Sequence, residues 1–163
     1  MSQILENVYY DAVILENAST KEEVIQYLSG YLMQKGYVNQ EYLKATLERE
    51  DSCPTGLPTK PVGIAVPHSK AENVIRPAVI MGIAKKLIPF AEMGNSKSVI
   101  AVGIIFLLAL QGENRHLNYL KNIVNFCKQE DKLMTLYKVT SREEAYRIFH
   151  SEILCLPGDG NQP

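Results

Sequence analysis

Cysteine is scarce in this sequence, and the few residues present form no recognisable motif. There are three cysteines, Cys53, Cys127 and Cys155, and none of them belongs to a C-x-x-C pair. A disulfide framework and a structural zinc site both need paired cysteines, so an odd number without such pairs indicates neither. Unpaired thiols are typical of a protein in the reducing cytosol, and we therefore expect a cytoplasmic location.

The sequence also lacks the features of membrane and secreted proteins. Its longest apolar run, VIAVGIIFLLAL at 99–110, has 12 residues, whereas a membrane-spanning helix needs roughly 20. The N-terminal MSQILENVYYD has no basic segment followed by an apolar one, so it is not a signal peptide. The net charge of −1 gives no overall positive field, so we expect neither nucleic acid nor an anionic membrane as a direct partner.

What is present is the composition of an ordinary globular protein. The chain has 163 residues, 46% of them hydrophobic and 21% charged, which is enough for one domain with a substantial core. We expect this single domain to span residues 1–155. The remaining LPGDGNQP, at 156–163, is rich in glycine and proline and is expected to be an unstructured tail.

Apolar runs alternate with helical patterns along the chain. We expect strands at 11–17, 64–66, 78–86 and 99–110, and helices at 19–36, 39–50, 115–129 and 140–153. Capping boxes are predicted at Ser19 with Glu22 and at Thr140 with Glu143. The segment 51–63 has three prolines and two glycines and is predicted to be a loop. The alternation predicts an α/β fold with a central mixed sheet flanked by helices.

Two of the three histidines follow predicted strands. His68 comes directly after Pro67, whose fixed φ holds the chain direction at the strand end, and His116 opens the helix after the 99–110 strand. Ligands of open α/β sheets gather beyond strand ends, so these rings could meet if the two strands are neighbours. The simpler interpretation is a surface loop histidine and a solvated helix-start residue. His150 lies among apolar residues of the last helix, and we assign it to packing or surface.

Arg49 ends the second predicted helix, just before the loop that leads to His68. An arginine at a helix C-terminus is usually explained by the helix dipole. A guanidinium is also a permanently charged, fork-shaped ligand for phosphate. A neutral imidazole can attack a phosphoryl group while such donors hold the equatorial oxygens, so His68, His116 and Arg49 are the candidate site residues. No Walker loop or kinase signature is present, so the donor would be another phosphorylated protein rather than bound ATP.

Several short segments together resemble a known family. These are Arg49-Glu50, the segment GIAVPHSK at 63–70, the strand IIFLLAL at 104–110, and His116-Leu117. In order and spacing they are similar to the enzyme IIA domains of the bacterial sugar phosphotransferase system, fructose–mannitol superfamily, over residues 10–152. The segment PTGLP at 54–58 resembles the galactitol-type branch.

This resemblance implies a function for the candidate residues. It implies an α/β sandwich in which His68 accepts a phosphoryl group from the histidine-containing phosphocarrier protein and passes it to a cysteine of an enzyme IIB component. That component phosphorylates a sugar crossing the membrane IIC transporter, so the membrane is involved only indirectly. His116 would lie beside the phosphorylated ring, and Arg49 would assist phosphate binding. No cofactor or metal is implied, and Thr55 and Ser69 are possible hydroxyl neighbours.

Other interpretations stay open at this point. A regulatory module of the same fold would use its phosphorylation state to control a partner protein. A metal-dependent hydrolase would use His68, His116 and a carboxylate, although no H-E-x-x-H spacing is present. No IIB cysteine loop or IIC segment is found, so we expect a free-standing IIA protein. An apolar rim around His68 is expected from Ile64, Val66 and the 54–62 loop, since transfer between proteins requires exclusion of water.

Overall fold

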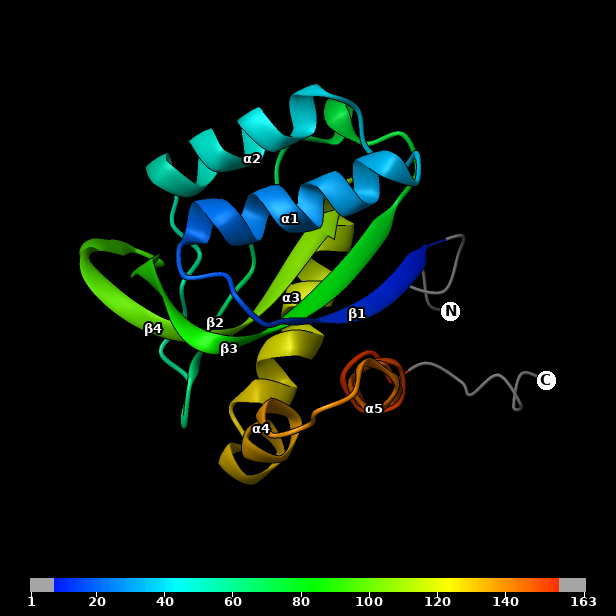
Figure 1. The fold of residues 1–163 in the computed structure, drawn as a ribbon. Helices are drawn as coiled ribbons and strands as arrows, with labels where there is room; N and C mark the ends of the chain where they lie inside the picture. Colours follow the sequence, from blue (N-terminus) through cyan, green and yellow to red (C-terminus); the bar gives the residue numbers. More distant parts are fainter. Residues whose placement is uncertain (1–7, 156–163) are drawn as a thin grey trace.

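A mixed sheet of four strands forms the centre of the molecule (Figure 1). The computed structural model describes residues 8–155, and for residues 113–116 it describes the backbone only. The strands are β1 (Tyr9–Leu15), β2 (Gly63–Ala65), β3 (Ala78–Glu92) and β4 (Asn95–Ala109). The helices are α1 (Lys21–Gln34), α2 (Glu41–Ser52), η2 (Ala71–Asn73), α3 (Glu113–Cys127), α4 (Glu130–Tyr137), α5 (Arg142–Ile148) and η3 (Phe149–Ile153).

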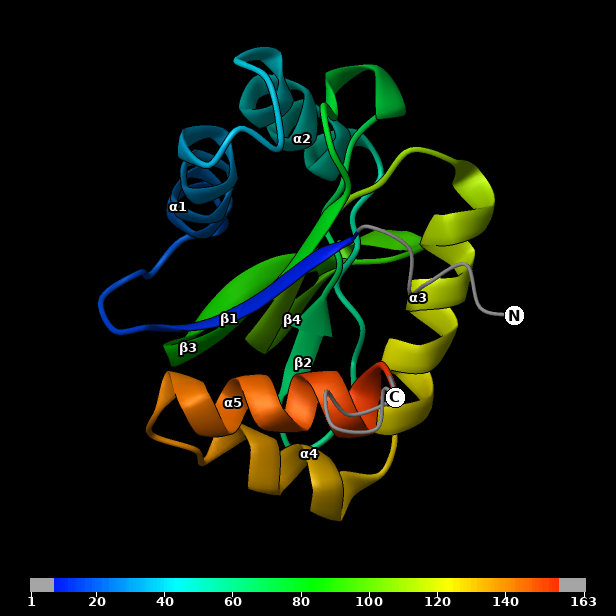
Figure 2. The ribbon, with the colours of Figure 1, turned by 90° about the vertical axis from the view of Figure 1, so that its right-hand side faces the viewer.

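The strand order is β1-β3-β4-β2, with parallel pairing at both ends and an antiparallel pair in the middle. The α1 and α2 helices cover one face of the sheet, and α3, α4 and α5 cover the other (Figure 1, Figure 2). This arrangement confirms the predicted α/β fold with a mixed sheet flanked by helices.

Each face of the sheet has its own apolar core because successive strand residues point to opposite sides. In β4, Ile104 and Phe106 pack with the α3–α5 layer, whereas Ile105 and Leu107 pack with the α1–α2 layer. All four are fully buried. The continuous apolar run of β4 is therefore explained by burial on both faces, as expected for a central strand.

The β3 strand is longer than predicted. It continues past 86 to Glu92 and returns through a turn at Gly94, whose φ of 80° favours glycine. The register with β4 shifts between Ile83 and Ile88, and beyond this irregularity the buried side chains alternate, with Ile88 and Phe90 inside. Pairing with β4 thus extends the strand beyond its predicted end at residue 86.

Both predicted capping boxes are wrong by one residue. The first box is formed by Thr20 and Glu23: the Thr20 hydroxyl accepts from the Glu23 amide at 3.1 Å, and the Glu23 carboxylate accepts from the Thr20 amide. At the last helix, the Ser141 hydroxyl accepts from the Glu144 amide. In each case two hydroxyl residues and two glutamates stand in sequence, so the pattern fits either register and the chain geometry decides.

The C-terminal part of the chain differs from the prediction and lies partly outside the described residues. The α4 helix was not predicted, and the last helix changes to a π-helical turn at Phe149. The expected tail at 156–163 lies outside the described residues, so the domain boundary at 155 stays a prediction. Between residues 8 and 155, none of the helices has both the length and the apolar character needed to cross a membrane.

Candidate functional site

The segment that carries His68 continues the direction of β2 alongside β4. The amide of Leu108 donates to the Pro67 carbonyl oxygen at 3.1 Å, and His68 forms a parallel bridge with Leu108. Because β2 and β4 are parallel neighbours, their C-terminal ends lie at the same edge of the sheet. The helix α3 starts soon after the end of β4. The predicted condition for bringing His68 close to the start of this helix is therefore met.

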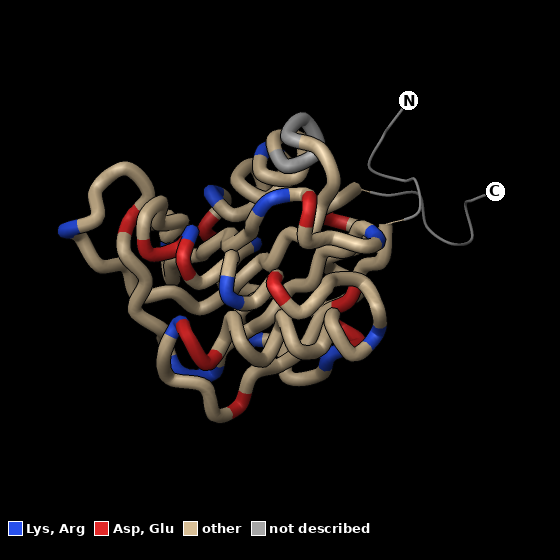
Figure 3. The backbone as a smooth tube through the Cα atoms, turned by 90° about the horizontal axis from the view of Figure 1, so that it is seen from above, with Lys and Arg blue, Asp and Glu red and all other residues tan. Residues whose placement is uncertain are grey.

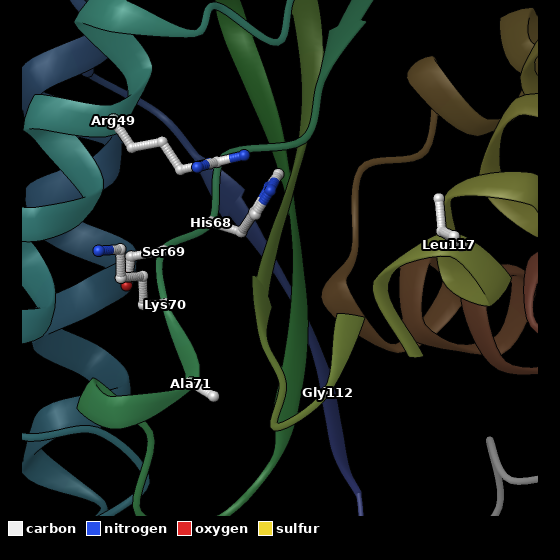
Figure 4. Close-up of a pocket in the computed structure, with 7 residues that line it drawn as sticks. All are labelled: Arg49, His68, Ser69, Lys70, Ala71, Gly112 and Leu117. Carbon is white, nitrogen blue, oxygen red and sulfur yellow. The ribbon is translucent and has the colours of Figure 1, made fainter. Parts of the chain in front are cut away.

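A pocket of about 490 Å³ lies at this edge of the sheet. Its lining residues are Arg49, His68, Ser69, Lys70, Ala71, Gly112 and Leu117. Figure 4 shows Arg49 reaching from α2 toward the imidazole of His68, with Leu117 on α3 across the pocket. Two layers of the fold therefore meet here, with α2 supplying the guanidinium and α3 the opposite wall.

The imidazole of His68 is held in one tautomer. Its Nδ1 lies 2.9 Å from the carbonyl oxygen of Val66. A carbonyl oxygen only accepts, so Nδ1 carries the proton and Nε2 carries the lone pair of the neutral ring. Burial lowers the pKa of His68, the bond to Val66 opposes this, and the positive charge of Arg49 lowers the pKa further. The ring is therefore uncharged at neutral pH, which is the state a nucleophile requires.

Positive charge near the site is local rather than spread over a surface. Arg49 in the last turn of α2 and Lys70 after the histidine both line the pocket. Elsewhere in the described chain, acidic and basic residues are interspersed (Figure 3). Figure 4 shows the Lys70 ammonium directed toward α2, away from the His68 ring, so Arg49 is the cationic group beside the neutral imidazole and suits an anionic group the size of phosphate.

The first turn of α3 borders the same pocket. Gly112 is the N-cap, with a φ of 150°, and both Gly112 and Leu117 line the pocket. The N-terminus of a helix presents backbone N–H groups and the positive end of the helix dipole. Next to Arg49 and His68, this helix end adds to the donors available for an anion.

The structure places the other predicted site residues as follows. His116 lies in the first turn of α3, and its side chain is outside the described part of the structure, so its proximity to His68 stays a prediction. His150 lies on η3 with its ring centroid 5.6 Å from that of Tyr146, and it is not among the pocket residues.

The hydroxyl groups of Thr55 and Ser69, which were expected beside the His68 ring, do not point to it. The Thr55 hydroxyl is engaged within the protein, donating to Glu50 and accepting from the Val66 amide. Ser69 lines the pocket, but its side chain lies on the α2 side of the chain, opposite the His68 ring (Figure 4). Glu50 was not recognised from the sequence as part of the site, although it follows Arg49 directly. Its role depends on how the 53–62 loop folds back, and no local pattern encodes that.

The apolar rim also differs from the prediction. Ile64 and Val66 are core residues, with 0% and 1% of their surface exposed. They alternate with residues of the other core because β2 is covered on both faces. Leu117 is 63% exposed and lines the pocket, so the apolar rim is provided by α3.

No cluster of three or more His, Cys, Asp or Glu side chains suited to a metal ion occurs among the described side chains. The metal-dependent hydrolase therefore gains no support from them.

Comparison with known proteins identifies the family. The family model for the phosphoenolpyruvate-dependent sugar phosphotransferase system, EIIA 2, matches residues 9–152. The mannitol-specific phosphotransferase enzyme IIA component of Bacillus subtilis is 26% identical over 138 residues, covering 83% of this chain and 90% of that protein. The mannitol-specific EIICBA component of Buchnera aphidicola (subsp. Acyrthosiphon pisum) is 29% identical over 143 residues, covering 86% of this chain but only 21% of that protein. The chain thus spans about a fifth of the length of the Buchnera relative.

A solved structure shares the fold. The complex of enzyme IIA mannitol and phosphorylated enzyme IIB mannitol from Escherichia coli contains a chain that is 26% identical, with a TM-score of 0.69. The match covers 93% of this chain and 95% of that one.

Two further relatives bear on narrower assignments. The galactitol-specific EIIA component of Escherichia coli is 24% identical over 116 residues, covering 71% of this chain and 77% of that protein. This is a shorter match than those to the mannitol proteins, so the galactitol branch is not confirmed. The transcriptional regulator ManR of Bacillus subtilis is 30% identical over 114 residues, covering 69% of this chain and 16% of that protein.

The predicted resemblance to enzyme IIA is confirmed, and the chain belongs to the EIIA 2 family of the phosphoenolpyruvate-dependent sugar phosphotransferase system.

Proposed function

We propose that this chain is a phosphoryl carrier whose acceptor atom is Nε2 of His68. The observation that carries the proposal is the bond from Nδ1 to the Val66 carbonyl, because it leaves the nucleophilic lone pair of a neutral ring on Nε2. Arg49 reaches toward this ring from α2. We therefore assign His68 as the nucleophile and Arg49 as a ligand of the phosphoryl oxygens.

The proposed donor is the phosphohistidine of the histidine-containing phosphocarrier protein. The Nε2 lone pair of His68 forms a new N–P bond while the N–P bond of the donor breaks, and its electron pair returns to the donor ring. Charge on the equatorial oxygens is stabilised by Arg49 and the N-terminus of α3. His116 is assigned to the same group of donors from the family resemblance. The partly exposed Leu117 helps to exclude water when the donor docks.

The proposed acceptor is a cysteine thiolate of an enzyme IIB component. The E. coli relative is known in complex with phosphorylated enzyme IIB, as its name states, and this supports the same kind of partner here. Mannitol-type relatives match the chain over more residues than the galactitol one, so we propose uptake of a sugar alcohol, with mannitol ahead of galactitol. The exposed thiols of Cys53 and Cys155 suit work in a reducing cytoplasm.

The test is phosphorylation by the purified general components. The protein is incubated with phosphoenolpyruvate, enzyme I and the phosphocarrier protein, and the added phosphoryl group is mapped by mass spectrometry and NMR. We expect one acid-labile, base-stable group on Nε2 of His68. It should be absent in His68→Gln and retained in His150→Gln. Labelling that persists in His68→Gln, or that appears on Nδ1, would contradict the proposal.

A regulatory module is the second candidate, and the similarity to ManR favours it. In that case His68 would be phosphorylated in the same way, but the phosphoryl group would not reach a sugar. A panel of phosphate-free IIB domains separates the two. Transfer to a mannitol- or galactitol-type IIB cysteine supports the transport role, and failure with every IIB domain supports the regulatory one.

A further inference from the structure

A series of hydrogen bonds, joined through the backbone of Val66, links α2 to the ring of His68. The Glu50 carboxylate accepts from the amide and the hydroxyl of Thr55, each at 2.9 Å. The Thr55 hydroxyl oxygen accepts from the Val66 amide at 3.0 Å. The Val66 carbonyl in turn accepts from Nδ1 of His68. The end of α2, the loop after it and the segment of His68 are therefore linked through Thr55 and Val66.

The chemistry of the end groups sets the direction of these bonds. A backbone N–H only donates, and an ionised carboxylate only accepts. The Thr55 hydroxyl lies between them, so its oxygen accepts from Val66 and its proton points to Glu50. A valine side chain at position 55 would fill the same space with no polar group at all.

This arrangement continues the pairing along the outer edge of β2. Leu57 and Ile64 exchange two backbone bonds, at 2.8 and 3.1 Å. Residues two apart in a strand direct their N–H and C=O groups to the same edge, so the next groups on this edge belong to Val66. At residue 55 the loop backbone turns back toward α2, and the Thr55 side chain takes the place of a strand partner.

We propose that Glu50 and Thr55 are positioning residues for His68: they hold the backbone of Val66 through its N–H, so that its carbonyl, on the next peptide unit, receives Nδ1–H. The orientation and tautomer of the ring then depend on the hydrogen bonds between Glu50 on α2 and Thr55. This inference deepens the proposed function and rests on His68 being the phosphoryl acceptor. It assigns to Glu50 and Thr55 an indirect role in transfer, since neither residue contacts the phosphoryl group.

The burial of the pair is difficult to explain by stability alone. Glu50 is 2% exposed and Thr55 is 3% exposed. Burial raises the pKa of Glu50, while both bonds from Thr55 and the charge of Lys21 oppose this. A buried carboxylate often contributes less to stability than an apolar residue of the same size would. A role in holding the backbone of Val66 would explain why a carboxylate, rather than an apolar side chain, is buried at this position.

The test uses substitutions that differ in one hydrogen-bonding group. Thr55→Val removes the hydroxyl at nearly constant shape, and Thr55→Ser restores it. Glu50→Gln removes one of the two acceptor oxygens. The matched control is Thr59→Val, because the Thr59 hydroxyl donates to the Val62 carbonyl at 2.7 Å in the same loop but does not contact Val66.

Two readouts are measured on each full-length protein. The first is the 15N NMR spectrum of the His68 ring without phosphate, which reports the population of the Nδ1–H tautomer. The second is the separation of kcat and KM for transfer from the phosphorylated carrier. In Thr55→Val we expect a mixture of tautomers and a kcat lower by about tenfold to a hundredfold with little change in KM, since docking surfaces are unchanged. Thr55→Ser should recover both values, and Thr59→Val should not change them.

The outcomes separate this inference from the proposed function. Thr55→Val with a wild-type tautomer and kcat, but lower stability to denaturant, would show that the pair is merely structural. If wild-type His68 is never phosphorylated, the proposed function fails, yet the NMR spectra still decide whether Glu50 and Thr55 set the tautomer. If Thr55→Val does not fold, Glu50→Gln is judged on the same two readouts and by the same criteria.

Discussion

Tyr42 donates its hydroxyl to the carbonyl oxygen of Leu108 at 2.8 Å, across the interface between α2 and β4. Leu108 also donates its amide to the Pro67 carbonyl. A fully buried tyrosine thus connects the helix that carries Arg49 to the strand end that holds the His68 segment. The position of Arg49 relative to His68 is set by a core contact as well as by the loop between them.

Tyr42→Phe should therefore destabilise the protein. The substitution leaves the Leu108 carbonyl buried without this donor, and a buried unsatisfied group costs about 1–3 kcal/mol. We expect the free energy of unfolding in urea to fall by this amount. Tyr27→Phe is the control, because Tyr27 is 53% exposed, and it should change little. Equal stability of Tyr42→Phe and wild type would mean that the bond contributes nothing to the fold.

Arg49 should contribute both charge and geometry to transfer. Arg49→Lys keeps the charge but loses the planar fork, whereas Arg49→Ala loses both. We expect quench-flow rates of transfer from the phosphorylated carrier to fall by about tenfold for lysine and about a hundredfold for alanine. Arg147→Ala, which removes an exposed arginine paired with Glu144 on α5, is the control. If Arg49→Ala transferred at the wild-type rate, the guanidinium would not hold the phosphoryl group.

His116 should support the same step from the start of α3. If its ring donates to the developing charge, His116→Ala should raise the barrier by about 2–4 kcal/mol, while some phosphorylation of His68 remains. His150→Ala is the matched control and should transfer normally. A wild-type rate for His116→Ala, measured by the same quench-flow method, would remove this ring from the site.

The strand pattern predicted the edge of the sheet at which His68 lies. An apolar run ending at Pro67, and a second run followed by the helix of His116, placed both histidines after strands, and β2 and β4 do pair in parallel. The strand order itself was not readable, because long-range pairing depends on contacts that no local pattern contains. The same reason explains the missed end of β3, where pairing with β4 continues through Pro89.

The hydrogen bonds around His68 could not be predicted. The 51–63 segment was recognised as a loop from its prolines and glycines, but its path determines which group meets Val66. Thr55 was named only as a hydroxyl neighbour of the site, and the structure shows its hydroxyl already engaged by Glu50. From the sequence, Glu50 was named only with Arg49 in the motif that carries the resemblance, and it was given no role of its own. Burial of a carboxylate depends on tertiary contacts, so the sequence did not show that Glu50 is buried.

The titration of His68 should appear in the pH dependence of stability. Burial, opposed by the Val66 bond and aided by Arg49, lowers the pKa of His68 in the folded state below its usual 6.5. As pH falls below 6.5, the ring takes up a proton in the unfolded chain but not yet in the folded protein. Protonation therefore favours the unfolded chain, and the free energy of unfolding decreases until the pH reaches the lower pKa of the folded state. The free energy of unfolding of wild type, relative to His68→Gln, should therefore decrease between about pH 7 and pH 5. An increase over that range would mean that the ring is charged in the folded protein.

Ser69 should be dispensable for stability despite its place next to His68. It is 4% exposed, and its hydroxyl has no hydrogen-bond partner among the described residues. Burial of an unpaired hydroxyl is unfavourable, so Ser69→Ala should leave the free energy of unfolding unchanged or raise it by up to about 1 kcal/mol. Ser141→Ala makes a direct contrast, because that hydroxyl accepts from the Glu144 amide at the start of α5 and its loss should cost about 1 kcal/mol. Since the Ser69 side chain lies opposite the His68 ring, the rate of phosphoryl transfer should also be unchanged (Figure 4). A slower transfer with an unchanged KM would show instead that the hydroxyl reaches the phosphoryl oxygens during the reaction.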